Sequence, residues 1–204
     1  MTPYRPARAA LRRLTAVANG QGGYFTAKQA QAAGYDYPHL VYHIDTGNFE
    51  RVGHGIYRLP SVRPAEHDDL IRLTLWSRAR DDRPQAVVSH ETALALHELS
   101  DVLPSKTHVT VPKSFRKTAP RGCVLHKAAI QPGDIEEREG FRITGPLRTL
   151  LDVADYTSQD QLEKAVRQAL ERGLVRRRAL DSIVSKHGKN DRLSRVLALV
   201  DNRP

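Results

Sequence analysis

Apolar residues near the start of the chain recur with the period of an α-helix. Residues 7–18 predict a helix that gathers four apolar side chains on one face: Leu11, Leu14, Val17 and Ala18. Tyr24–Phe25 then form a short apolar anchor. A second helix is predicted to begin after Thr26, a good N-cap, because Gln29 stands where a capping box needs Glu or Gln. Gly34 supplies the left-handed residue that commonly ends a helix.

The following residues predict a third helix and a two-stranded ribbon. Pro38 fits the first turn of this helix, which stops at Gly47 and directs three apolar residues inward: Leu40, Val41 and Ile44. Residues 49–52 and 56–59 predict strands, and Gly53-His54-Gly55 joins them with glycines where a tight turn needs positive φ. Helix, helix, turn, helix and ribbon is the order of a winged helix-turn-helix. A small α+β module that shares this order is the alternative.

The rest of the chain predicts short strands followed by helices. Helices are expected over 66–80 and 91–99, the latter capped by Ser89. Strands are expected at 86–88, 107–111 and 123–126, and a hairpin turning at Gly140 at 134–137 and 141–144. Three or four helices follow, with Ser158 as one N-cap: 146–156, 159–172, 177–187 and 192–201. The expected fold class is α+β, an N-terminal winged helix-turn-helix plus a C-terminal mixed α/β domain ending in a helical bundle.

Two prolines close together mark the first domain boundary. They fall in the segment Leu59-Pro60-Ser61-Val62-Arg63-Pro64, which neither a helix nor a strand ladder tolerates. We therefore expect a DNA-binding domain at 1–60 and a C-terminal domain at 64–204.

Charge is unevenly distributed along the chain. The net charge of +9 divides into +4 for residues 1–60, −2 for 61–112 and +7 for 113–204. Two basic ends around an acidic middle favour a polyanionic partner, and a solvated arginine-rich surface is the alternative.

Composition narrows the cellular setting. The sequence has no apolar run near the length of a membrane span, and no apolar segment of a secretory signal follows the basic N-terminus. The single cysteine, Cys123, cannot form an internal disulfide, which fits a reducing cytoplasm. We expect a cytoplasmic protein with no membrane partner.

Candidate DNA-contacting residues follow from the predicted fold. The third helix would enter the major groove of double-stranded DNA with side chains near its start: Tyr37, His39, Tyr42 and His43. The ribbon and the first two helices would supply contacts to the phosphates or the minor groove: Arg8, Arg12, Lys28, Arg51, His54 and Arg58. His39 and His43 share a helix face as zinc ligands can, but no third ligand follows at zinc spacing, so we expect no metal and no cofactor. Each position could instead be solvated surface.

Three blocks of the sequence resemble a known family. They are residues 23–59, which include Arg51-Val52-Gly53-His54-Gly55-Ile56-Tyr57-Arg58-Leu59, the segment Ser89-His90-Glu91-Thr92-Ala93-Leu94-Ala95-Leu96-His97-Glu98-Leu99, and Thr144-Gly145-Pro146-Leu147-Arg148-Thr149-Leu150-Leu151-Asp152-Val153-Ala154. Together they resemble the AbiEi-like antitoxins, transcriptional regulators of bacterial type IV toxin–antitoxin and abortive-infection systems. The resemblance covers about residues 20–157.

The resemblance implies a two-domain antitoxin active in phage defence. Its winged helix would repress the shared promoter at inverted repeats, and its C-terminal domain would counter a nucleotidyltransferase-like toxin, directly or indirectly. The C-terminal part is short for the family, so the resemblance does not assign its neutralising surface. A stand-alone winged-helix regulator is an alternative.

An enzyme is the runner-up class. A small endonuclease-like domain would need converging carboxylates, for which the candidates are Asp134, Glu136, Glu137 and Glu139, but no carboxylate-x-Lys step follows them. Ser89, His90 and Asp101 suggest a triad without a nucleophile turn, and Cys123 and His126 face opposite sides of a strand. We therefore expect no catalytic residues and no enzyme.

A protein-interaction module is the third class. The C-terminal helices are rich in arginine and would present a surface for an acidic partner or for DNA: Arg167, Arg172, Arg176, Arg177 and Arg178. Arg148 and Asp152 stand four residues apart, so we expect them to pair on one helix face.

Overall fold

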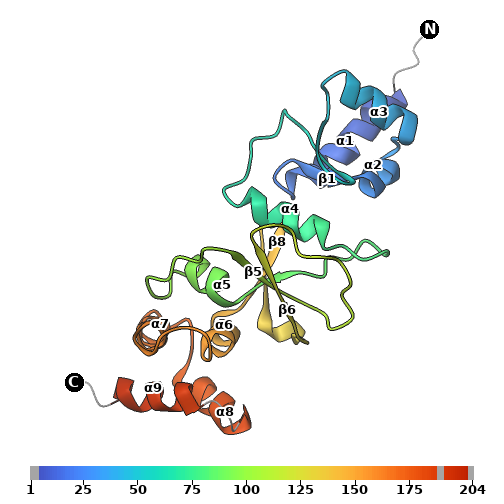
Figure 1. Ribbon diagram of the computed structural model, residues 1–204. Coiled ribbons are helices and arrows are strands. Elements are labelled where there is room, and N and C mark those ends of the chain that lie inside the picture. Colours follow the sequence, from blue (N-terminus) through green and yellow to red (C-terminus); the bar gives the residue numbers. More distant parts are fainter. Residues whose placement is uncertain (1–4, 188–190, 202–204) are drawn as a thin grey trace. The chain divides into compact units, whose positions relative to one another are not determined.

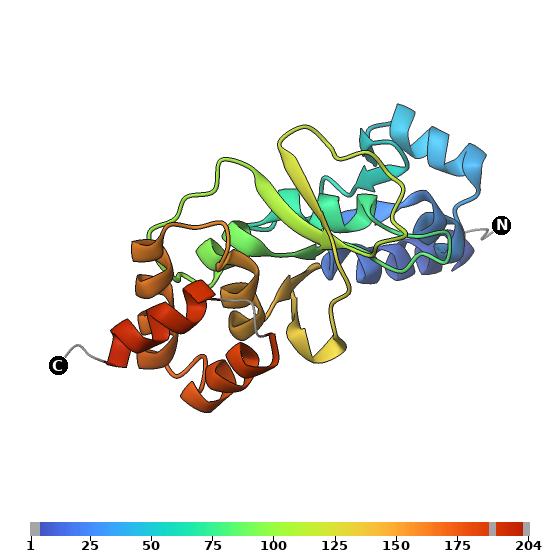
Figure 2. The same cartoon turned by 60° about the horizontal axis from the view of Figure 1, so that its bottom comes forward.

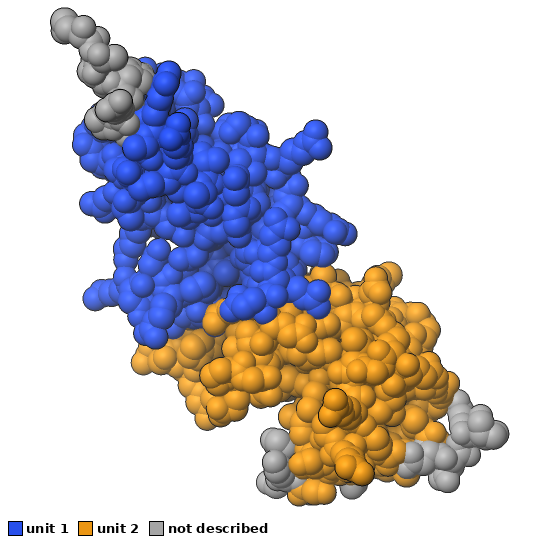
Figure 3. All heavy atoms as spheres, turned by 180° about the vertical axis from the view of Figure 1, so that it is seen from behind, with its two compact units in different colours: residues 1–86, 137–141 blue, residues 87–136, 142–204 orange. Residues whose placement is uncertain are grey.

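The computed structural model describes residues 5–187 and 191–201 and divides into two compact units (Figure 3). Unit 1 comprises the residues up to Ala86 together with 137–141, and unit 2 comprises 87–136 and the residues from Arg142 onward. The mixed helices and strands confirm the predicted α+β class. The predicted domain bounds, 1–60 and 64–204, stay a prediction.

Unit 1 contains the predicted helices and ribbon in the predicted order (Figure 1). Its elements are α1 (Arg5–Asn19), β1 (Tyr24–Thr26), α2 (Ala27–Ala33), α3 (Tyr37–Asp45), β2 (Glu50–Gly53), β3 (Ile56–Arg58) and α4 (Asp68–Trp76). The strands form one antiparallel sheet in the order β1-β3-β2. The Tyr24–Phe25 anchor is therefore a strand, which the sequence analysis did not predict.

Aromatic rings fill the centre of unit 1. The ring of Phe25 lies 5.2 Å from that of Phe49 and 5.7 Å from that of Tyr57, so β1 and β3 share a core with the segment before β2. Leu14 and Leu40 bring α1 and α3 onto the same core. Because this core fixes the inward sides of both helices, their opposite sides face solvent.

Three predicted inward positions are wrong. Leu11, Val17 and Val41 are exposed. The buried side chains of α1 are Ala10, Leu14 and Ala18, which recur every four residues. They form a narrow stripe, so only a small part of the helix surface packs on the core. On α3, Leu40 is buried and Ile44 is partly buried, while Val41 lies to the side.

Unit 2 builds on a mixed sheet. The sheet has the strands β4 (Val87–Val88), β5 (Thr107–Val111), β6 (Cys123–Lys127), β7 (Ile135–Arg138) and β8 (Phe141–Thr144), in the order β6-β5-β4-β8-β7. The residues where β7 turns into β8, 137–141, are counted with unit 1. β4 runs antiparallel to β5 and parallel to β8, and β5 runs parallel to β6. A 3-10 turn (Pro132–Asp134) precedes β7, and β7 and β8 are neighbours, as the predicted hairpin requires.

Helices of unit 2 share one apolar core. They are α5 (His90–Leu96), α6 (Pro146–Val153), α7 (Gln159–Glu171), α8 (Arg177–His187) and α9 (Asp191–Asp201), of which the last four run from orange to red in Figure 2. Leu94, Leu150, Leu162, Leu180 and Leu193 each bring one helix into this core. Within residues 5–187 and 191–201, no helix is both long enough and apolar enough to cross a membrane.

The two predicted N-caps of unit 2 differ in outcome. The Ser158 hydroxyl accepts a hydrogen bond from the Gln161 amide, as predicted. Ser89 occupies the N-cap position of α5 but makes no side-chain cap, because its buried hydroxyl accepts from Thr110 and bonds His90 instead. A neighbouring strand therefore competes with the helix for this side chain.

Candidate nucleic-acid interface

Local hydrogen bonds set the turn between α2 and α3. The Thr26 hydroxyl accepts from the Gln29 amide at 3.2 Å, and the Gln29 side chain accepts from the Thr26 amide at 2.8 Å, which is the predicted capping box. Gly34 ends α2 at φ 108°, where a side chain would be strained. The Asp36 carboxylate then caps α3 by accepting from the His39 amide at 3.0 Å. These contacts determine where α2 begins and ends and where α3 begins, so the turn between the two helices is short.

Arg13 fixes α1 to the end of α2. Its guanidinium donates twice to the Ala33 carbonyl, at 3.1 and 2.8 Å. This carbonyl belongs to the last turn of α2, where helix carbonyls lack partners within the helix. Arg8, Arg12 and Arg13 are all exposed, but of these only Arg13 is held by hydrogen bonds, and Arg8 and Arg12 have no partner among the described residues.

The candidates on α3 divide into exposed and half-buried residues. Tyr37, His39 and Tyr42 are exposed, and the His39 ring lies 2.8 Å from the Asp36 carboxylate. His43 is half-buried: its ring stacks on Phe49 at 4.8 Å and meets the edge of Tyr35 at 5.2 Å. Burial lowers the pKa of His43, and the nearby His39 lowers it further. His43 therefore supports α3 from the side of the core.

The ribbon presents two of its three candidates to solvent. Arg51 on β2 and His54 at the tip are exposed. Gly55 has the expected positive φ of 67°, whereas Gly53 belongs to β2 and has none. Arg58 faces Glu50 across the ribbon at 3.3 Å and donates to the Val62 carbonyl at 2.9 Å. A phosphate would have to compete with both contacts for Arg58.

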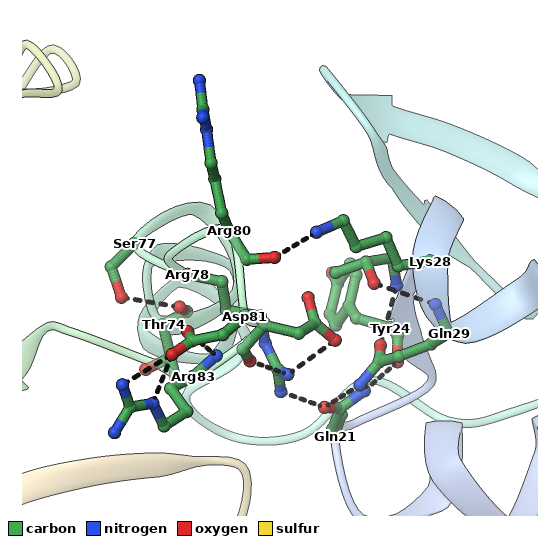
Figure 4. Close-up of polar contacts among 12 residues, drawn as sticks. Gln21, Tyr24, Lys28, Gln29, Thr74, Ser77, Arg78, Arg80, Asp81 and Arg83 are labelled. Atoms are coloured by element: carbon green, nitrogen blue, oxygen red, sulfur yellow. Dashed lines mark hydrogen bonds and ion pairs between the residues drawn. The ribbon is translucent and has the colours of Figure 1, made fainter. Parts of the chain in front are cut away.

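A polar network near the start of α2 was not predicted from the sequence (Figure 4). Gln21 lies at its centre: it donates to the Tyr24 carbonyl at 2.9 Å and accepts from Arg78 at 2.8 Å and from Gln29 at 3.0 Å. Lys28 donates to the Arg80 carbonyl. The network joins α2 to the segment after α4, so Lys28 has an internal partner, and its predicted phosphate contact stays a prediction.

Three of the five candidate arginines of unit 2 are held by contacts within the chain. Arg167 pairs with Glu163, Arg177 pairs with Asp181 at 2.9 Å, and Arg172 donates to the carbonyls of His97 and Glu98 at 2.9 and 3.0 Å. Arg176 and Arg178 are exposed, and no hydrogen bond or ion pair holds their side chains within the part of the chain that the structure describes. The predicted pair of Arg148 and Asp152 is present at 2.8 Å.

Three imidazole rings meet in unit 2, and we call them the histidine cluster: His90, His108 and His126. The rings of His90 and His126 stack at 3.5 Å, and a nitrogen of His108 lies 3.0 Å from one of His126. Burial, followed by the charges of His126, His108 and Arg148, lowers the pKa of His90 to about 3. The stack is therefore uncharged at neutral pH.

The surroundings of four candidate catalytic groups are described by the structure: Ser89, His90, Asp101 and Cys123. Ser89 does contact His90 at 2.9 Å, but the hydroxyl is buried, and Asp101 is paired with Lys164. Burial raises the pKa of Cys123, which makes its thiol a weaker nucleophile. No set of three or more His, Cys, Asp or Glu side chains is arranged to hold a metal ion in the described ranges.

Comparisons with known proteins show two family models that match the chain. Residues 10–60 match a family model described as a transcriptional regulator, AbiEi antitoxin, and residues 85–199 match one described as the AbiEi antitoxin C-terminal domain. No curated protein matches the chain. A solved structure, the RV2827C protein from Mycobacterium tuberculosis, is 16% identical over 94% of this chain and 81% of that chain, with a TM-score of 0.45. A TM-score this low does not establish a shared fold.

Proposed function

Since the chain belongs to the AbiEi antitoxin family, we propose that it represses its own promoter and counters a nucleotidyltransferase-like toxin encoded beside it. Unit 1 binds inverted-repeat DNA through the exposed side of α3, with residues 1–60 as the DNA-binding domain. Unit 2 carries the antitoxin activity. The proposed setting is the cytoplasm of a bacterium, in type IV toxin–antitoxin regulation and phage defence.

One observation supports the DNA-binding half most directly. The described side chains of α3 divide between a core side and a solvent side, and Tyr37, His39 and Tyr42 all lie on exposed positions. The major groove is about 12 Å wide and admits a helix whose outer side chains reach the bases. Arg8, Arg12 and Arg51 are exposed on neighbouring elements of unit 1, where they can meet phosphates without losing a partner among the described residues.

A gel shift with the full chain tests this half. The probes are the DNA upstream of the chain's own gene and unrelated DNA of equal length, each at two salt concentrations. We expect selective retention that weakens steeply with salt, because released counterions dominate such binding. Absent retention of both probes at low salt would contradict DNA binding, and equal retention of both would contradict selection of the promoter.

Matched variants separate bases from phosphates. Tyr42→Ala removes an exposed side chain of α3 and is expected to lower the preference for the promoter probe. Arg51→Gln is expected to weaken binding to both probes equally and to reduce the salt slope by about 1. Arg13→Gln is unsuitable as a phosphate control, because Arg13 ties α1 to α2.

The antitoxin half is supported by the family match over residues 85–199, most of which belong to unit 2. Among the five candidate arginines of its C-terminal helices, Arg176 and Arg178 are exposed and have no internal partner among the described residues, so they are the first candidates for a partner surface. Arg177, which pairs with Asp181, stands between them in sequence and serves as a matched control.

Co-expression with the product of the neighbouring gene tests the antitoxin half. We expect the chain to restore growth, the double variant Arg176→Glu and Arg178→Glu to fail, and Arg177→Gln to succeed. Retained DNA binding by the failing variant would place these arginines at a protein surface. Lost DNA binding with a shallower salt slope would instead place them on DNA. No rescue by the wild-type chain would contradict the antitoxin role.

A further inference from the structure

The solvent side of α3 is apolar and aromatic. Leu40 is 3% exposed and marks the core side of the helix, while Tyr42, two positions on and so about 200° around the axis, is 60% exposed. Val41 beside it is 36% exposed, and Tyr37 at the start of the helix is 76% exposed. Because Leu40 anchors the helix in the core, these three side chains are held outward, and the Tyr42 ring meets the edge of His43 on the same helix at 5.4 Å.

The side chains that read guanine and adenine are missing from α3. Arginine and lysine bind guanine edges, and asparagine and glutamine bind adenine edges, each by a pair of hydrogen bonds. The sequence Tyr37–Asp45 contains none of these four residue types. Asn48, the nearest amide, donates to Thr46 just after the helix. The His39 ring is engaged by Asp36.

One group in the major groove suits an apolar side chain. The 5-methyl of thymine is the apolar mark on a base edge, and contact with it distinguishes thymine from the other bases. Carboxylates at Asp36 and Asp45 bracket α3, so the helix itself offers phosphates no attraction. Exposed arginines lie on α1 and β2 instead. Attraction to the phosphates would therefore come from α1 and β2, and discrimination between bases would come from α3.

We infer that Val41 and Tyr42 on α3 recognise thymine 5-methyl groups in the major groove, and that the operator is selected through thymine-containing steps. This inference rests on the proposed DNA binding and adds the class of base that is read. Affinity comes from the arginines of α1 and β2, and selectivity comes from apolar contact on α3.

Uracil substitution tests the inference on the full chain. The probe is the promoter fragment with its thymines replaced by uracil, which removes the methyl groups and keeps base pairing. Burying one methyl-sized group is expected to change affinity about fourfold, so each contacted methyl should contribute about that factor. The salt slope should stay unchanged, because no phosphate contact is lost.

A double-mutant cycle assigns the effect to α3. The variant Val41→Ala with Tyr42→Ala should bind thymine DNA more weakly and should no longer distinguish thymine from uracil. Tyr42→Phe keeps the ring and should preserve the preference. Leu11→Ala removes an exposed apolar side chain from α1 and should leave the preference intact. All these residues are exposed, so the fold should tolerate the changes.

The outcomes separate the two proposals. Equal affinity for thymine and uracil fragments, with the promoter still selected over unrelated DNA, overturns the methyl inference and leaves DNA binding standing. A thymine preference that survives in the double variant also overturns it, because the methyls are then sensed elsewhere. Absence of selection on thymine DNA overturns both.

Discussion

Arginines of unit 1 and of unit 2 look alike in the sequence but differ in what their guanidinium groups contact. Arg8, Arg12 and Arg51 in unit 1 are exposed, and the described residues offer their side chains no partner. Arg167, Arg172 and Arg177 in unit 2 are bound to carboxylates or carbonyls of the chain itself. A count of positive charges therefore overstates how much of unit 2 is available to a polyanion.

The largest expected effect comes from removing the exposed arginines of unit 1. The triple variant Arg8→Gln, Arg12→Gln and Arg51→Gln should lower promoter affinity about a hundredfold near 0.1 M salt and flatten the salt slope by roughly 3. A salt titration of the gel shift measures both. The matched triple variant is Arg167→Gln, Arg172→Gln and Arg177→Gln, which removes the same charge from unit 2. An equal loss of slope in this second variant would erase the difference between the units.

Histidines extend the comparison to pH. His54 in unit 1 is exposed, whereas His90 is buried within the histidine cluster of unit 2. His126 and His108 face His90 from the sheet, the Ser89 hydroxyl bonds it, Tyr156 meets its edge, and the Arg148 charge lies nearby: these groups surround the ring. Burial lowers the pKa of His108 as well, while the Glu91 charge raises it and the Lys106 charge lowers it.

Protonation should therefore favour unfolding of unit 2. The pKa of His90 is lowered from 6.5 to about 3 in the folded chain, so its contribution to stability is complete above 6.5 and is lost as the pH falls toward 3. Between those values the unfolded chain holds an extra proton, which costs about 1 kcal/mol of stability per pH unit. Urea unfolding at a series of pH values measures the slope.

A substitution at His90 isolates this effect. His90→Asn removes the titrating ring, and asparagine tolerates the positive φ of 53° at this position. We expect the acid-side slope to become shallower in this variant. The same slope in the His90 variant would assign the pH dependence to His108, to His126 or to the carboxylates.

Two arginines of unit 2, Arg172 and Arg176, differ in whether their side chains hold a hydrogen bond, and their substitutions should differ in the free energy of unfolding. Arg172→Gln removes two donors from the carbonyls of His97 and Glu98, at a turn where Glu98 has a positive φ of 54°. We expect a loss of about 1–2 kcal/mol in the free energy of unfolding. Arg176→Gln should stay within about 0.5 kcal/mol, since no hydrogen bond or ion pair within the described chain holds that exposed side chain. Equal losses in both would mean that the surface charge, and not the turn contact, sets the stability.

Sequence patterns predicted those features of the molecule that depend on neighbours along the chain. The helical period, the Thr26 and Gln29 capping box and Gly34 located α2 within a residue, because each signal acts over a few positions. Contacts between distant residues were missed. Arg78 reaches Gln21 across 57 positions, and the ring contact of His108 with His126 depends on the β5–β6 register. No local pattern encodes either.

The candidate site shows the same division. Exposure of Tyr37, His39 and Tyr42 agrees with the predicted outer side of α3, whereas Val41 was assigned to the core because its spacing fits either side of the helix. Lys28 and Arg58 were chosen by charge alone, and both are held by partners that only the fold supplies. Charge type is visible in the sequence, but availability of a charge is a property of tertiary structure.

The smallest expected effect compares one N-cap from each unit. Thr26→Ala removes the reciprocal capping box of α2 and should lower the free energy of unfolding by about 1 kcal/mol, whereas Thr26→Ser should preserve it. Ser158→Ala removes a single, longer bond of 3.4 Å at an exposed helix start in unit 2, so about 0.5 kcal/mol is expected. Urea unfolding of both variants measures the difference. Because α2 leads directly into the turn before α3, Thr26→Ala should also weaken promoter selection, and Ser158→Ala should leave it unchanged. If Ser158→Ala weakens selection as much, then the orientation of α3 does not depend on the local start of α2, and the capping box serves stability alone.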